Sequence, residues 1–181
     1  MKPLREPARN NQQTYFVSSQ TWGRRALFRN AKWAELFIET LLHYRSSAFQ
    51  LHEFVLMPDH FHLLLTPVTS LEKAMQLMNG GFSHRVKAEL GSSLEIWQRG
   101  FSDHRIRDAQ DYIKHVDYIC RNPVMKRLCF EPKDYPYGSA SGRFELDPPP
   151  QWLKPRSSNE SNGTAEAVPL QDIKAKGQGV E

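Results

Sequence analysis

The sequence has few of the features that mark membrane, secreted or disulfide-stabilised proteins. Its 181 residues include only two cysteines, Cys120 and Cys129, too few for a disulfide framework, so a reduced chain is the simpler interpretation. No apolar run reaches the ~18 residues of a transmembrane helix. The charged N-terminus lacks the apolar stretch of a secretory signal. We therefore expect no membrane partner and a cytoplasmic location.

What remains is the composition of one ordinary folded domain. The chain is 39% hydrophobic with a formal net charge of +4, enough apolar content for a single core and a slightly basic surface. From residue 155 onward there is no aromatic residue, and Ser, Asn, Gly, Lys and Glu predominate. Such a segment cannot offset its own ordering entropy, so we expect disorder there. A run of three prolines at 148–150 marks the boundary, and residues 1–13 resemble a basic, polar arm.

Hydrophobic periodicity predicts a strand, a helix, two strands, a helix, a strand and a last helix. The expected strands are 15–17, 51–57, 60–66 and 103–107, and the expected helices are 30–46, 71–90 and 108–122. A hairpin turn at Pro58-Asp59 joins the second and third strands. Gly80-Gly81 should weaken or bend the second helix, and Pro123 should end the third at Asn122. This order predicts an α+β fold, the ferredoxin-like βαββαβ antiparallel sheet backed by helices, with the extra helix available for function.

Two histidines alternate along the third predicted strand. Side chains two apart on a strand share a face, so His60 and His62 project together while Phe61 points to the other side. Two imidazoles on one face can share a divalent ion. Because such pairs also arise by chance, contact with backbone or solvent is the competing interpretation.

The last predicted helix places a tyrosine away from its apolar stripe. Tyr112, Val116 and Ile119 form that stripe, whereas Tyr118 lies on the polar side, one turn before Asn122. Tyr118 is either an ordinary exposed residue or a nucleophile, and Tyr112 fits the core better. An oxygen of Asn122 could complete a metal shell with the two histidines.

Basic side chains gather around this helix, with acidic residues interleaved. They can contact phosphates, although a solvated, mixed-charge surface is the alternative. Trp97 and Phe101 could stack on bases, with core packing at least as plausible. The candidate nucleic-acid contacts are Arg85, Lys87, His104, Arg105, Arg107, Lys114, His115 and Arg121.

Three blocks together resemble a known family. They are Val55-Leu56-Met57-Pro58-Asp59-His60-Phe61-His62, then Tyr118-Ile119-Cys120-Arg121-Asn122-Pro123-Val124, then Tyr135-Pro136-Tyr137-Gly138-Ser139-Ala140. Over residues 13–142 the chain is similar to REP-associated tyrosine transposases, members of the single-tyrosine HUH endonuclease superfamily that includes insertion-sequence transposases. Gly138 stands where the family's closing block usually has serine. On this resemblance, residues 14–146 form the HUH transposase domain and 147–181 the Pro-rich boundary and disordered tail.

The resemblance implies a metal-dependent single-stranded DNA endonuclease. It implies that His60, His62 and Asn122 hold Mg²⁺ or Mn²⁺, and that Tyr118 forms a 5′-phosphotyrosine while cleaving and rejoining DNA near hairpins. The implied partner is single-stranded or hairpin DNA with REP-like palindromes, which would place the protein at the nucleoid, as a monomer or a homodimer. A non-catalytic binder of DNA or RNA hairpins is the alternative, but all four site residues are present.

Overall fold

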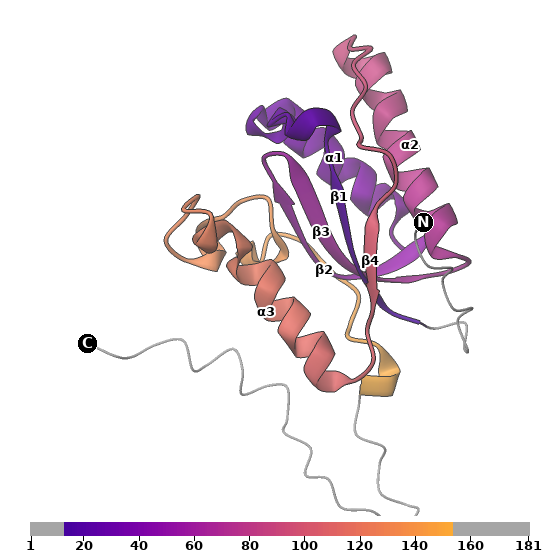
Figure 1. Cartoon of the computed structure of the whole chain (residues 1–181), viewed down its shortest axis with the longest axis vertical. Coiled ribbons are helices and arrows are strands. Elements are labelled where there is room, and N and C mark those ends of the chain that lie inside the picture. The colour runs from indigo at the N-terminus through magenta and orange to yellow at the C-terminus, as the bar shows by residue number, and fades with distance from the viewer. Residues whose placement is uncertain (1–12, 154–181) are drawn as a thin grey trace, which may run out of the picture. The chain divides into compact units, whose positions relative to one another are not determined.

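The computed structural model describes residues 13–153, and Figure 1 shows the arrangement of its elements. The expected arm up to residue 12 and the tail from residue 154 lie outside the described residues. The strands are β1 (Tyr15–Gln20), β2 (Phe49–Met57), β3 (His60–Pro67) and β4 (Ser102–Arg105), and the α-helices are α1 (Ala31–Tyr44), α2 (Leu71–Leu90) and α3 (Ala109–Met125). Residues 151–153 form a short 3-10 turn that belongs to a separate unit. In the described part of the chain, no helix is long and apolar enough to cross a bilayer.

The four strands form one sheet in the order β2-β3-β1-β4, with every neighbouring pair antiparallel. The predicted hairpin joins β2 to β3 across Pro58 and Asp59. β3 inserts between β1 and β2, so both helical connections skip a strand. This is the ferredoxin-like arrangement that the order of elements predicts.

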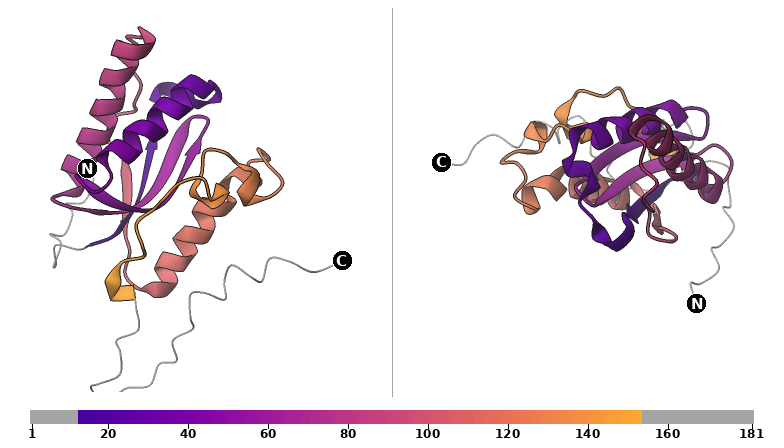
Figure 2. Two further views of the ribbon diagram at one scale, coloured as in Figure 1. Left: turned by 180° about the vertical axis from the view of Figure 1, so that it is seen from behind. Right: turned by 90° about the horizontal axis from the view of Figure 1, so that it is seen from above.

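Helices cover the two faces of the sheet unequally. α1 and α2 pack on one face, and α3 lies across the other (Figures 1 and 2). Because strand side chains alternate, Phe61, Leu63 and Leu65 of β3 enter the core under α1 and α2. His60 and His62 therefore face α3. Trp97 packs into the α1–α2 core against Phe61, which favours the core interpretation of this residue.

The glycine pair in α2 does not interrupt that helix, which is continuous from Leu71 to Leu90. Gly81 instead permits close packing, since a Cβ there would lie 2.6 Å from the ring atom Cε2 of Tyr44 on α1. Gly80 has open space in the same position. Gly81 alone therefore serves the contact between α1 and α2.

The predicted end of the last helix at Asn122 is wrong, because α3 continues through Pro123 to Met125. Pro123 has no N–H to donate to the preceding turn, but the helix continues, and the Lys126 N–H donates to the Asn122 carbonyl. The Pro123 ring is buried and lines an apolar pocket, so its packing contributes to the stability of this turn. Asn122 consequently remains helical, one turn beyond Tyr118.

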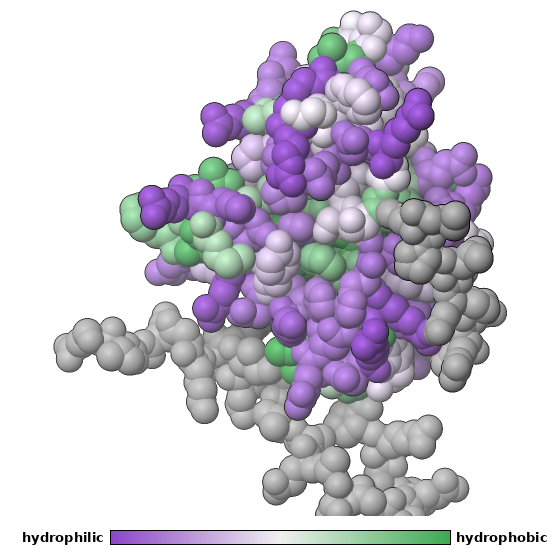
Figure 3. Space-filling model, viewed as in Figure 1, coloured by the Kyte–Doolittle hydropathy of each residue, from purple (hydrophilic) through white to green (hydrophobic). Residues whose placement is uncertain are grey.

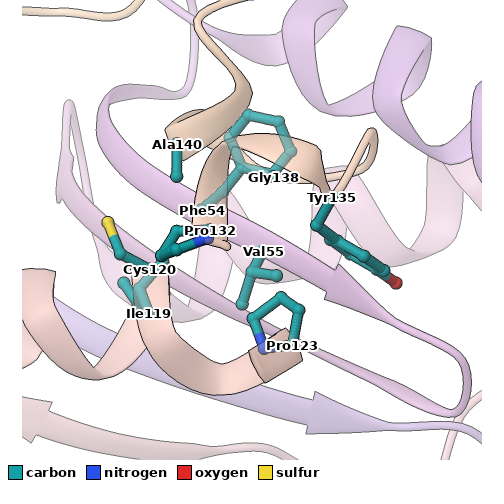
Figure 4. Close-up of a pocket in the computed structure, with 9 residues that line it drawn as sticks. All are labelled: Phe54, Val55, Ile119, Cys120, Pro123, Pro132, Tyr135, Gly138 and Ala140. Carbon is teal, nitrogen blue, oxygen red and sulfur yellow. The ribbon is translucent and has the colours of Figure 1, made fainter. Parts of the chain in front are cut away.

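The chain after α3 returns to the sheet and holds the helix against β2. Gly138 bridges to Val55, and the Tyr135 hydroxyl donates to the Leu56 carbonyl. Residues of β2, α3 and segment 132–140 line a small apolar pocket at this junction (Figure 4). Further on, the Asp147 carboxylate accepts from the Leu51 N–H and from Arg45, so this first boundary residue is tied to β2.

Candidate functional site

β3 presents two imidazole rings side by side toward α3, with their centroids 4.9 Å apart. The Nδ1 of His60 lies 2.6 Å from the Asp59 carboxylate, and the Nδ1 of His62 lies 2.6 Å from the Ser18 hydroxyl. With Nδ1 donating in each ring, each Nε2 carries the lone pair that a metal ion requires. The His-Phe-His pattern thus places two oriented nitrogen donors on one face.

His62 is the buried member of this pair. Only 6% of it is exposed, and burial, with a smaller contribution from the neighbouring His60, lowers the pKa of His62 to about 3. The ring is therefore neutral at physiological pH. A neutral imidazole is the form that ligates metals.

Tyr118 approaches the two histidines from α3, which lies across from β3. Its hydroxyl lies 3.5 Å from the Nε2 of His62, and its ring contacts the rings of His62 and Phe16. Tyr118 is still 40% exposed, so a large substrate can approach the phenol. By contrast, Tyr112 is 4% exposed, and burial, followed by the charge of Glu53, raises its pKa. The structure therefore separates an accessible tyrosine from a core one.

Asn122 carries a polar atom whose partner is missing from the described residues. Its side chain is 2% exposed, yet its Oδ1 makes no hydrogen bond there. A buried carbonyl oxygen is rarely left so, and a ligand or ion is a common explanation. Asn122 lies one helical turn from Tyr118. An amide oxygen together with two imidazole nitrogens is a donor set that fits a divalent ion.

A second group that could hold a metal ion lies between β4 and the first turns of α3. It consists of His104, Asp111 and His115, whose ligand atoms lie within 4.8 Å of one another. Burial favours the neutral acid of Asp111, but hydrogen bonds from His104 and from the Arg107 N–H outweigh it, so the pKa of this carboxyl lies below its usual range. The carboxylate therefore stays ionised beside the two imidazoles.

One aromatic residue that sequence reasoning missed connects these groups. The Phe16 ring on β1 stacks on His62, with centroids 5.3 Å apart, and packs on His115 at 4.6 Å. Asp59 and Ser18, which orient the two histidines, were missed as well. A carboxylate next to a predicted metal-binding histidine was a visible signal for Asp59. Phe16 and Ser18 follow only from the register of β1 against β3.

The candidate nucleic-acid contacts do not all share one face. His104 stacks on His115, which packs on Phe16. Lys114 and Arg121 are exposed on α3, where Arg121 pairs with Asp117. On the other side of the sheet, α2 carries Arg85 and Lys87, and Arg85 is bound to Glu39 and Glu89. Arg105 donates to Gln13, and Arg107 is exposed before α3. The structure thus brings the α3 and β4 candidates together and leaves the α2 candidates apart.

Known proteins resemble this chain over most of its length. A family model described as "Transposase IS200 like" matches residues 12–122. The REP-associated tyrosine transposase of Escherichia coli (strain K12) is 25% identical over 148 residues, which cover 74% of this chain and 87% of that protein. A putative REP-associated tyrosine transposase of Haemophilus influenzae is 33% identical over 96 residues, 46% of this chain and 54% of its own.

A solved structure has the same fold. It is that of a REP-associated tyrosine transposase bound to a REP hairpin, with a TM-score of 0.65 and 22% identity over 91% of this chain and 100% of the other. The matched family region contains β1 to β4 and most of α3, including His60, His62, Tyr118 and Asn122. The chain therefore belongs to the IS200-like transposase family, a family of DNA-binding transposases.

Proposed function

We propose that this protein is a metal-dependent endonuclease that cleaves and rejoins single-stranded DNA next to a hairpin, with Tyr118 as the nucleophile. The observation that carries the proposal is the approach of the Tyr118 hydroxyl to within 3.5 Å of the His62 Nε2, on a face that also bears His60. A nucleophile must lie next to the group that polarises its target, and this arrangement supplies both.

The chemistry is a transesterification that conserves phosphodiester bonds. The Tyr118 oxygen attacks the scissile phosphorus and loses its proton, while the bond from phosphorus to the 3′ oxygen breaks. The 3′ end leaves as a hydroxyl, and the 5′ phosphate remains on Tyr118. Attack by a 3′-hydroxyl on this phosphotyrosine reverses the step, so rejoining requires no ATP. Exposure of Tyr118 lets a DNA strand reach it, and its hydroxyl lies beside the His62 Nε2 that would hold the metal ion.

His60, His62 and Asn122 are the residues that would hold the metal ion. Two imidazole nitrogens are oriented from behind by Asp59 and Ser18, and the buried Asn122 Oδ1 supplies an oxygen. A bound Mg²⁺ or Mn²⁺ would act as a Lewis acid on the scissile phosphate. Because imidazole favours ions softer than Mg²⁺, we expect Mn²⁺ to bind at least as tightly.

The DNA partner is proposed from the relatives and from the surface. A structurally similar transposase is bound to a REP hairpin, and by analogy this chain would bind hairpin DNA with REP-like palindromes. Exposed Lys114 and Arg121 on α3 are placed to contact phosphates near Tyr118. We assign the catalytic domain to residues 14–146, and a DNA substrate would place the protein in the cytoplasm at the nucleoid.

The segment after α3 adds a surface suited to unpaired bases. Phe130 is 97% exposed, and Lys126 and Arg127 precede it on the same exposed turn. Figure 3 shows apolar side chains gathered at this edge of an otherwise largely hydrophilic face. Stacking of a base on an aromatic ring contributes ~1–3 kcal/mol, so Phe130→Ala should weaken binding of hairpins with single-stranded flanks by about tenfold. Fluorescence anisotropy would measure this loss, and blunt hairpins should bind both proteins equally.

A covalent-adduct gel tests the central proposal. The purified protein is mixed with 5′- and 3′-labelled hairpins drawn from DNA flanking its gene, with Mn²⁺ or with EDTA. We expect a metal-dependent adduct that carries the fragment downstream of the break, joined through its 5′ phosphate, and therefore the 3′ label. It should be absent in Tyr118→Phe and retained in the matched control Tyr112→Phe. An adduct in Tyr118→Phe would exclude Tyr118 as the nucleophile. Tight hairpin binding with no adduct would favour the non-catalytic hairpin binder.

A further inference from the structure

The group formed by His104, Asp111 and His115 has no part in the proposed chemistry of Tyr118. His104 comes from the edge strand β4, whereas Asp111 and His115 lie one turn apart on α3. The His104 Nε2 lies 2.8 Å from Oδ2 of Asp111, and the two imidazole rings stack with their centroids 4.8 Å apart. Phe16 separates this group from His62.

Hydrogen bonds to neighbouring backbone groups orient His115 and Asp111 so that each has a free lone pair for a cation. The His115 Nδ1 lies 2.7 Å from the backbone carbonyl of Asp111 and 3.2 Å from its Oδ1, so this N–H faces two oxygens and the lone pair of that ring is on Nε2. The Arg107 N–H donates to Oδ2 of Asp111 and so orients this carboxylate. In proteins, hydrogen bonds of this kind from neighbouring groups orient the imidazoles and carboxylates that bind metal ions.

The donor set indicates the kind of ion. Two nitrogens and one carboxylate oxygen are the ligands of many three-residue zinc sites, in which a fourth position stays open. Ligands ~2.0–2.1 Å from a tetrahedral ion lie about 3.4 Å from one another. The three ligand atoms here are within 4.8 Å, and the side chain of His104 is 40% exposed, which gives it room to rotate inward. Hard ions such as Mg²⁺ prefer oxygen-rich sites and fit this group poorly.

We propose that His104, Asp111 and His115 form a second divalent-metal site that selects zinc-class ions and is separate from the His60–His62 pair. A metal ion there joins β4 to the first half of α3, the helix that carries Tyr118. When the ion binds, the Nε2 proton of His104 moves to Nδ1, and the hydrogen bond between His104 and Asp111 is replaced by two bonds to the metal. The site therefore fastens α3 to the sheet.

Equilibrium dialysis with zinc chloride tests the proposal through stoichiometry. We expect two Zn²⁺ per wild-type chain and one in His60→Ala/His62→Ala. Adding His104→Gln to that double variant should remove the last ion, since glutamine can still donate to Asp111 but offers no imidazole. The matched control adds His84→Gln, an exposed histidine on α2, and should retain one ion. Binding of no Zn²⁺ by His60→Ala/His62→Ala, or of one Zn²⁺ after His104→Gln, would overturn the proposal.

Thermal unfolding provides a second readout that does not depend on activity. In His60→Ala/His62→Ala, Zn²⁺ at about a hundred times its dissociation constant should raise Tm by roughly 5–10 °C. Adding His104→Gln should abolish this shift while leaving the Tm without metal within about 2 °C. Equal Zn²⁺ shifts with and without His104→Gln would contradict the assignment. Neither readout involves Tyr118, so failure here leaves the proposed DNA cleavage untouched.

Discussion

Phe16 has no reactive atom, but it contacts three side chains of the candidate site. Its ring touches His62, His115 and Tyr118, with centroid distances of 5.3, 4.6 and 5.7 Å. The ring therefore packs between the strand that carries the histidines and the helix that carries the tyrosine. Displacement of a reacting group by about 1 Å can slow a reaction a hundredfold.

Replacing Phe16 should therefore reduce the rate of the proposed reaction more than it reduces affinity. We expect Phe16→Leu, which keeps most of the volume but loses the flat ring, to slow adduct formation by about 10–100-fold at saturating hairpin. Hairpin affinity should change less than about threefold. Single-turnover gels and anisotropy titrations would separate the two effects. Equal losses of rate and affinity would show that Phe16 acts through DNA binding instead.

For single residues, the sequence predicted which candidate side chains share a face better than it predicted the residues around them. Alternation on a strand placed His60 and His62 together, and helical spacing placed Tyr118 one turn from Asn122. The structure places the Tyr118 hydroxyl 3.5 Å from the His62 Nε2, so the residues of the proposed site lie together. The sequence could not assign Phe16 and Ser18 to the site. Their place depends on the pairing of β1 with β3, which the whole sheet determines and residue spacing does not encode.

Among the elements, α2 shows how adjacent glycines can differ in role. A Cβ at Gly81 would meet the Tyr44 ring at 2.6 Å, whereas one at Gly80 would meet nothing within 4 Å. Gly81→Ala should lower the free energy of unfolding by about 1 kcal/mol, because Tyr44 must move away. Gly80→Ala should raise it by ~0.5–1 kcal/mol, since alanine favours a helix. Urea unfolding would compare them, and equal effects would contradict the close packing of α1 on α2.

The two basic helices should also differ in their contribution to DNA binding. α3 carries Tyr118 with exposed Lys114 and Arg121, whereas Arg85 of α2 is bound to Glu39 and Glu89 on the far face. The variant Lys114→Ala/Arg121→Ala should weaken hairpin binding by about tenfold and reduce the salt slope by ~0.7 per lost phosphate contact.

The α2 substitution Lys87→Ala is the matched control and should leave both the affinity and the salt slope unchanged. Anisotropy titrations between low and high salt provide the measurement. A large loss in Lys87→Ala would place DNA on α2 instead. The sequence could not make this distinction, because a basic residue on a helix does not reveal which face of the sheet the helix covers.

For the whole molecule, the order of elements was enough to predict the fold. Short connections force β2 and β3 into a hairpin, and helical connections that each skip a strand produce the observed strand order. The sequence did not predict that α3 lies on the opposite face of the sheet, because this position depends on the segment after the helix. That segment returns to β2 through Gly138, Tyr135 and Asp147. Local sequence patterns contain no signal for such a return.

His52 of β2 contacts the segment that returns to the sheet, and its burial makes the stability of the fold depend on pH. The buried ring lies 2.8 Å from the Pro148 carbonyl through Nδ1 and 2.9 Å from the Thr66 hydroxyl through Nε2, with Asp147 and the Tyr112 ring also facing it. A neutral ring satisfies both bonds, donating to the first and accepting from the second. Burial lowers the pKa of His52, although the backbone bond to Pro148 and the charge of Asp147 oppose the shift.

The sign of the pH effect follows from this lowered pKa. Below about pH 6.5 the unfolded chain binds a proton at His52 that the folded chain does not, so stability is lost as the pH falls. Between pH 7.5 and 5 most carboxyls stay ionised, and histidines dominate the change. We expect His52→Gln, which has no titrating group, to lose less stability over this range than the wild type in urea unfolding. Parallel pH profiles would mean that His52 takes up a proton equally in both states.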